Sequence, residues 1–205
     1  MSSFRAPWAL CGGWAVDAWL GRQSRDHGDI DVSVFADDQR TLFEHLPGWQ
    51  LLAHDPDRPA GNGEWWDGRR HLNAPAHIHS RPPELSGAIP KDGIATAEDG
   101  FTLEFQINLR EGDEWVLSRE PRMTMPLQRT VRQSDWGLPT LVPEAVLFYK
   151  ATAYFGVEEF KDRRAQDEPD FVALLASLTK RQRDWLREAI SLVHPDHPWL
   201  AQLST

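Results

Sequence analysis

Alternating apolar and polar residues predict two half-buried strands in this chain. Residues 29–34 alternate strictly, so the two acidic residues, Asp29 and Asp31, are expected on one face. The apolar residues of this strand are expected to point into the core: Ile30, Val32 and Val34. Residues 101–109 alternate in the same way, with Glu104 on the polar face. The first strand therefore presents two carboxylates on its polar face and the second presents one, with a hydrophobic surface on the other side of each.

Apolar residues at helical spacing predict the helices. The glycine pair Gly12-Gly13 opens a short first helix, and Asp37 is expected as the N-cap of a second helix that Pro47-Gly48 ends. The remaining helices are expected after Pro143 and over residues 169–178 and 180–193. Asp167 is interpreted as a cap of the helix beginning at Glu168-Pro169, without a chemical role.

The segment from His54 to Pro90 is rich in Pro, Gly, His, Asp and Arg and is expected to wrap the surface after a short strand over residues 49–53. It includes the aromatic pair Trp65-Trp66 and a possible strand over residues 77–79. Loops on a scaffold often carry substrate contacts, so this segment is expected to help choose a substrate.

Asp29 and Asp31 form the strongest candidate site. Two neighbouring carboxylates repel each other unless a cation lies between them. Hard oxygen ligands on one face suit Mg²⁺, which fills its remaining positions with water and phosphate. The glycine pair, without a Cβ, lets backbone N–H groups and the positive end of a helix approach a phosphate. Together these parts predict a site for a metal and a polyphosphate.

The same residues carry a resemblance to known proteins. A GG-opened helix followed by D-I-D on a strand resembles the signature of the DNA polymerase β-type nucleotidyltransferase superfamily. The string GGWAVDAWLGRQSRDHGDID more closely resembles the aminoglycoside 2''-adenylyltransferases and lincosamide nucleotidyltransferases. Residues 141–151 (LVPEAVLFYKA) and 163–171 resemble later segments of these families, although Gln166 stands where a lysine is usual and Pro169 replaces a small residue.

The resemblance implies an α+β fold. A nucleotidyltransferase core over residues 1–135, a small mixed sheet flanked by helices, would precede a C-terminal helical lobe over residues 136–205. The nucleotide would lie between these two parts.

The resemblance also implies roles for individual residues. Asp29, Asp31 and Glu104 would form the catalytic, metal-binding set, with Glu104 either a ligand or the general base. Nearby rivals for the third carboxylate are Glu111, Asp113 and Glu114. The nucleotide phosphates would be bound by the residues Gly12, Gly13, Arg25, His27 and Lys150.

The implied reaction is Mg²⁺-dependent transfer of a nucleoside monophosphate, AMP, from an NTP to a hydroxyl of a small acceptor. An aminoglycoside-like antibiotic is the favoured acceptor, because a net charge of −9 and ten tryptophans suit ammonium-bearing sugars. Two alternatives stay open: a nucleotide-binding regulator or antitoxin without transferase activity, which Gln166 keeps in view, and nucleotidylation of a protein.

Composition narrows the remaining possibilities. The acidic charge disfavours nucleic acid as a partner, and the sequence contains no apolar run long enough to span a membrane. The single cysteine, Cys11, is interpreted as a small buried hydrophobe and fits a cytoplasmic protein. Two histidine pairs, His77/His79 and His194/His197, lack further ligands at zinc-site spacing and are not interpreted as metal sites. The sequence does not indicate an oligomeric state.

Overall fold

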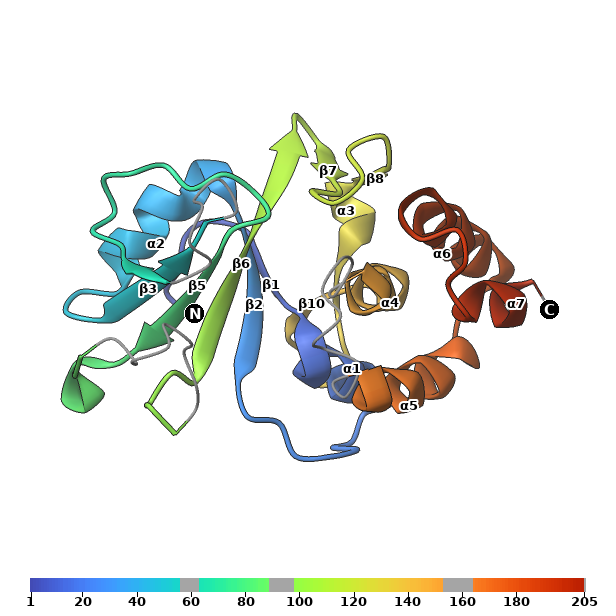
Figure 1. Cartoon of the computed structure of the whole chain (residues 1–205), viewed down its shortest axis with the longest axis horizontal. Coiled ribbons are helices and arrows are strands. Elements are labelled where there is room, and N and C mark those ends of the chain that lie inside the picture. Colours follow the sequence, from blue (N-terminus) through green and yellow to red (C-terminus); the bar gives the residue numbers. More distant parts are fainter. Residues whose placement is uncertain (56–62, 89–97, 153–163, 205) are drawn as a thin grey trace.

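The computed structural model describes residues 1–55, 63–88, 98–152 and 164–204. Within these residues, ten strands form one mixed sheet with helices on both faces, so the predicted α+β class is confirmed with more strands than the sequence pattern indicated (Figure 1). The strands are β1 (Trp8–Leu10), β2 (Ile30–Phe35), β3 (Gln50–His54), β4 (Glu64–Trp65), β5 (His77–Arg81), β6 (Leu103–Glu111), β7 (Glu114–Val116), β8 (Thr124–Pro126), β9 (Val131–Gln133) and β10 (Pro139–Leu141). The helices are α1 (Gly12–Leu20), α2 (Gln39–His45), α3 (Leu127–Thr130), α4 (Pro143–Thr152), α5 (Arg164–Leu175), α6 (Lys180–Val193) and α7 (Trp199–Leu203), with 3-10 turns η1 (Ala36–Asp38) and η2 (Pro83–Leu85).

The centre of the sheet is the parallel pair β2 and β6. The strand order is β4-β3-β5-β6-β2-β1-β10-β9, and β7 and β8 extend the sheet from β6. In the register of the central pair, Asp31 lies opposite Glu104. Partners in register point to the same face, so the pairing itself brings the polar residues of the two predicted strands together.

Two hydrophobic clusters cover the two faces of the sheet. Val32 and Val34 pack in the cluster that includes α2, whereas Phe35 packs in the cluster formed with α1, α4, α5 and α6 (Figure 1). Asp31 and Phe35 are four residues apart on β2, so they share the face turned toward α1 and α4. Ile30, predicted to be in the core, is 44% exposed because it is the first residue of β2, at the end of the strand.

The predicted N-cap at Asp37 is wrong. The 3-10 turn η1 precedes α2, so the N-cap position of α2 is Asp38, and its side chain makes no capping hydrogen bond. The carboxylates of Asp37 and Asp38 lie 3.4 and 3.2 Å from the guanidinium of Arg110 on β6. A cation on a neighbouring strand therefore binds the acids that the sequence pattern assigned to capping.

The interpretation of residues 54–90 as a surface segment holds for only some of its described residues, and the possible strand over residues 77–79 is confirmed. Strand β5, which contains the predicted strand at residues 77–79, lies inside the sheet between β3 and β6. Trp66 and Leu72 are buried, and only Trp65 of the tryptophan pair is exposed, at 41%. The polar composition hid this strand because its histidines occupy one face and Ile78 the other. Residues 56–62 and 89–90 of this segment lie outside the described residues.

Helix α5 begins earlier than predicted. It starts at Arg164 and carries Pro169 in its interior, so Asp167 lies within the helix and does not cap it. Contacts on both sides hold this first part in place despite the proline: Asp167 binds Lys150, and Glu168 accepts a hydrogen bond from the indole of Trp199. Helix α6 spans the predicted residues and begins with a capping box made by Thr179 and Gln182.

The division of the chain at residue 135 stays a prediction. Strand β10 follows this position yet pairs in parallel with β1, so residues beyond 135 also belong to the sheet. Among the described residues, we find no helix with the length and apolar character needed to cross a membrane.

Candidate active site

Three carboxylates meet at the end of the central strand pair. One oxygen from each of Asp29, Asp31 and Glu104 lies within 4.8 Å of the others. Asp29 directly precedes β2 and is exposed, whereas Asp31 and Glu104 are half-buried. Gln106, two residues along β6, donates hydrogen bonds of 2.5 Å to Glu104 and 3.4 Å to Asp31. The amide therefore orients two of the three carboxylates toward each other.

Like charges accumulate at this point of the sheet. Burial and the negative charge of Asp29 raise the pKa of Asp31 from 3.8 to about 6. The buried thiol of Cys11 lies beside the cluster, and burial followed by the charges of Asp31 and Glu104 raises its pKa well above the ordinary value. A thiol held neutral in this way is a packing residue, as interpreted from the sequence.

The glycine pair packs directly against this cluster. Gly12 has φ +62°, and a Cβ at this position would lie 1.8 Å from Oδ2 of Asp31. A Cβ on Gly13 would lie 2.3 Å from Nδ1 of His27 and 2.8 Å from the guanidinium of Arg25. The backbone N–H of Cys11 donates to the carbonyl of Asp31 at 2.9 Å. Only glycine fits both positions, because the start of α1 touches two segments at once: strand β2 at Asp31, and the connector between α1 and β2 that carries Arg25 and His27.

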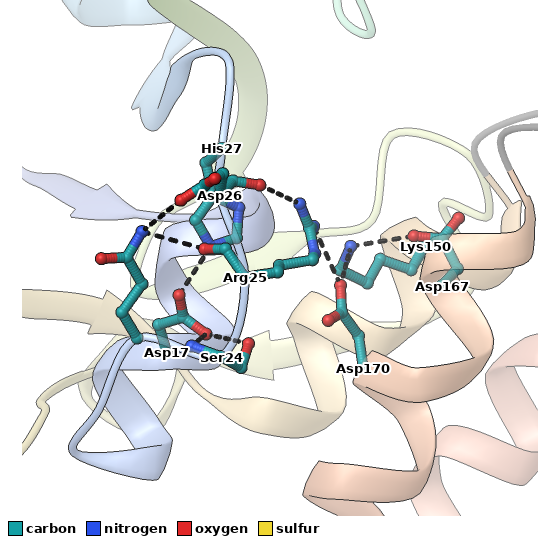
Figure 2. Close-up of polar contacts among 9 residues, drawn as sticks. Asp17, Ser24, Arg25, Asp26, His27, Lys150, Asp167 and Asp170 are labelled. Carbon is teal, nitrogen blue, oxygen red and sulfur yellow. Dashed lines mark hydrogen bonds and ion pairs between the residues drawn. The ribbon is translucent and has the colours of Figure 1, made fainter.

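A buried aspartate fixes the connector between α1 and β2. Asp17 is fully buried on α1 and accepts hydrogen bonds from the backbone and hydroxyl of Ser24 and from Nε2 of His27, the last at 2.6 Å (Figure 2). Burial opposes ionisation of Asp17, but the hydrogen bonds from Ser24 and His27 outweigh it and lower the pKa of this carboxyl. His27, whose ring also packs at a tilt against the ring of Trp14, thus holds the connector in place in the structure.

Arg25 and Lys150 converge on one acidic residue of α5. Asp170 lies 3.2 Å from the guanidinium of Arg25 and 2.8 Å from Nζ of Lys150, which also binds Asp167 at 2.9 Å (Figure 2). Burial would lower the pKa of Lys150, but its two carboxylate partners raise it, so the amine stays charged. These ion pairs hold Arg25, near the start of the chain, against α4 and α5, which lie much later in the sequence.

The rival third carboxylates lie elsewhere. Glu111 and Glu114 face each other in the hairpin between β6 and β7, and Asp113 is an exposed residue of its turn. Among the described residues, none of the three belongs to the acidic group that could hold a metal ion. Three residues of the site were not predicted from the sequence: Gln106, Asp167 and Asp170. Gln106 could have been predicted, because alternation along β6 places it on the same face as Glu104. The ion pairs of Asp170 depend on tertiary packing and leave no local pattern in the sequence.

Comparisons with known proteins bear on the family and the fold of this chain. Residues 1–52 match the family model described as aminoglycoside-2''-adenylyltransferase. No curated protein sequence matches the chain. A crystal structure of ANT(2")-Ia in complex with adenylyl-2"-tobramycin superposes with a TM-score of 0.53 at 14% identity, covering 91% of this chain and 88% of that chain. A solution structure of ANT(2")-Ia gives a TM-score of 0.53 at 14% identity, covering 96% of this chain and 86% of the other.

A lincomycin-bound structure of the lincosamide adenylyltransferase LnuA is less similar, with a TM-score of 0.44 at 15% identity and coverage of 80% and 84%. The family match and the two ANT(2")-Ia structures therefore carry the comparison. They confirm the resemblance drawn from the sequence: residues 1–52 match the aminoglycoside-2''-adenylyltransferase family, and the chain has the fold of ANT(2")-Ia.

Proposed function

We propose that this protein is a Mg²⁺-dependent nucleotidyltransferase that moves AMP from ATP to a hydroxyl of a small acceptor. The observation that carries the proposal is the convergence of Asp29, Asp31 and Glu104, with ligand oxygens within 4.8 Å of one another, beside the glycine pair. The match of residues 1–52 to an adenylyltransferase family supports the same reaction class.

The donor set fits magnesium. All three groups are carboxylates, the hard oxygen ligands that Mg²⁺ takes, and one side of the cluster is exposed through Asp29, where phosphate and water could complete the coordination. Burial and the neighbouring charge of Asp29 raise the pKa of Asp31, and a divalent cation would oppose both effects by stabilising the ionised carboxylates. When bound, Mg²⁺ neutralises charge that develops on the transferring phosphoryl group.

The residues around the carboxylates would position the nucleotide. The start of α1 at Gly12 and Gly13 presents backbone N–H groups and the positive end of a nine-residue helix to the phosphates. Arg25 and Lys150 are held nearby by Asp170, so their charges are oriented before a nucleotide arrives. His27 would contribute by holding this connector through Asp17.

The transfer itself is an in-line displacement. The acceptor hydroxyl oxygen would form a bond to the α-phosphorus while the bond from this phosphorus to the pyrophosphate oxygen breaks. The hydroxyl proton would pass to Glu104 if this residue acts as the general base, or to solvent if Glu104 serves as a metal ligand. His79 lies 3.4 Å from the Glu104 carboxylate and would help to orient it in either role.

A polyhydroxylated, cationic acceptor of the aminoglycoside type fits this chain best. The net charge of −9 attracts a cation, and ANT(2")-Ia, which shares the fold, has been solved with adenylyl-2"-tobramycin. The acceptor would be held between residues 54–90 and the C-terminal helices. Within the first of these segments, residues 56–62 and 89–90 lie outside the described residues.

The test is turnover of NTPs labelled on the α-phosphate, with Mg²⁺, against aminoglycosides, lincosamides and a cell extract. Label on a small molecule of the panel supports the proposal. Label on a protein of the extract would replace the acceptor by a macromolecule, and nucleotide binding without any transfer would favour a regulator. Gln166, which stands where the resembled families usually have a lysine and so left a regulator without transferase activity as an alternative, is an exposed residue of α5. It is not part of the carboxylate cluster in the described residues.

A further inference from the structure

Three histidines gather on the same face of the sheet as the carboxylates. His54 on β3 lies opposite His77 on β5 in the strand register, and His79 follows two residues later on the same face. One ring nitrogen from each histidine lies within 4.8 Å of the others. The rings of His54 and His77 stack at 4.8 Å between centroids, and His79 meets both edge-on at 5.0 and 5.1 Å.

The surroundings of His79 match a common arrangement at zinc sites. Its Nδ1 lies 3.4 Å from the Glu104 carboxylate. A histidine that binds zinc through one nitrogen generally presents the other to a carboxylate, which fixes the ring and increases its basicity. With Nδ1 against Glu104, Nε2 is the nitrogen that would ligate a metal.

We propose that His54, His77 and His79 form a second metal site, specific for a borderline-soft divalent ion such as Zn²⁺, next to the carboxylate cluster. Three imidazoles with an open fourth position are an established zinc ligand set. At a Zn–N distance of about 2.0–2.1 Å, tetrahedral ligands are about 3.4 Å apart. The three nitrogens lie within 4.8 Å of one another, so rotation of the rings would have to bring them to this separation. The nitrogen ligands distinguish this site from the carboxylate cluster, whose Glu104 lies 3.4 Å from Nδ1 of His79.

The test measures binding of the metal alone. Protein freed of metal by a chelator is titrated with Zn²⁺ by calorimetry in excess Mg²⁺, which occupies the carboxylates, and Co²⁺ is added separately to record its visible absorption. We expect one zinc per chain and the intense cobalt bands of a four- or five-coordinate nitrogen site. His77→Asn should weaken zinc binding at least about tenfold. His45→Asn, a control on α2, and Asp31→Asn should leave it unchanged.

Thermal denaturation establishes that each variant is folded, and His54→Asn, at the end of β3, replaces His77→Asn if the latter is not. Ring ¹⁵N spectra of the wild type give a result that needs no variant, because zinc should shift the three clustered imidazoles and spare His45. The proposal is overturned if the wild type binds no zinc, if His77→Asn binds it as tightly, or if Asp31→Asn abolishes binding. None of these results depends on nucleotidyl transfer, so the proposal and the proposed function can fail separately.

Discussion

Replacing Asp31 with asparagine should make the metal-free protein more stable while removing its activity. The side chain is half-buried beside Asp29 and Glu104, and its pKa rises from 3.8 to about 6. Each pH unit by which the folded pKa exceeds the unfolded one costs about 1.4 kcal/mol once the group is ionised, which gives ~3 kcal/mol for Asp31. Because part of the residue reaches solvent, we take ~2 kcal/mol as the expected gain for the isosteric Asp31→Asn.

The pH dependence follows from the same difference. Between about pH 4 and pH 6 the folded state binds more protons at Asp31 than the unfolded state does, so the stability of the metal-free wild type falls as the pH rises through this window. Asp31→Asn lacks this contribution. At pH 7.5 the variant should therefore melt roughly 4–8 °C higher than the wild type in chelator, and the two should converge near pH 4.

The assay is thermal or urea denaturation with and without Mg²⁺. Magnesium should raise the melting temperature of the wild type and leave Asp31→Asn unchanged, because the variant lacks a ligand. Asp29→Asn is the control: this residue is exposed, so its removal should increase stability less. A variant that is less stable than the wild type at pH 7.5, or that keeps the same slope between pH 4 and pH 6, would refute the electrostatic reasoning.

Three further substitutions test the supports of the site. Gly12→Ala should lower the free energy of unfolding by ~2 kcal/mol more than Gly112→Ala, because both glycines have positive φ but only a Cβ at Gly12 would lie against a carboxylate. Urea denaturation measures this difference, and equal losses would contradict the packing described. Asp170→Asn should destabilise the protein by ~3 kcal/mol, because it removes the carboxylate that Arg25 and Lys150 share. The control Glu44→Gln, from an exposed ion pair, should change stability by less than ~0.5 kcal/mol. Similar small effects for both variants would show that the buried pairs contribute little. Asp17→Asn should lower the free energy of unfolding by ~2 kcal/mol at pH 7, because the carboxylate accepts three hydrogen bonds. This loss of stability should shrink as the pH falls through the lowered pKa of the folded carboxyl. A loss that does not depend on pH would contradict the role of the ionised Asp17.

The sequence predicted the parts of the site that depend on local pattern. Strict alternation placed Asp31 and Glu104 on polar strand faces, and the parallel pairing of β2 with β6 then puts the two residues side by side. The glycine pair was likewise readable, because a helix start that approaches another chain segment closely requires residues without a Cβ.

The parts that the sequence did not predict depend on tertiary contacts. Asp167 and Asp170 bind Lys150, and a distance along the chain of 17 or 20 residues gives no local signal of such a pair. Strand β5 carries histidines where a buried strand usually carries aliphatic residues, so hydrophobic periodicity failed to identify it as part of the sheet. The start of α5 was predicted too late because Pro169 was interpreted as the beginning of the helix. Contacts with α4 and α7 hold the helical turn that precedes this proline.

The most direct test of the central claim is the fate of the α-phosphate of ATP. The wild type, incubated with α-labelled ATP, Mg²⁺ and the aminoglycoside panel, should transfer label to a small molecule and release pyrophosphate, and Asp31→Asn, although folded, should transfer none. Transfer that persists in Asp31→Asn, or a folded wild type that transfers label to no acceptor with any nucleotide, would contradict the assignment of Asp29, Asp31 and Glu104 as the catalytic centre.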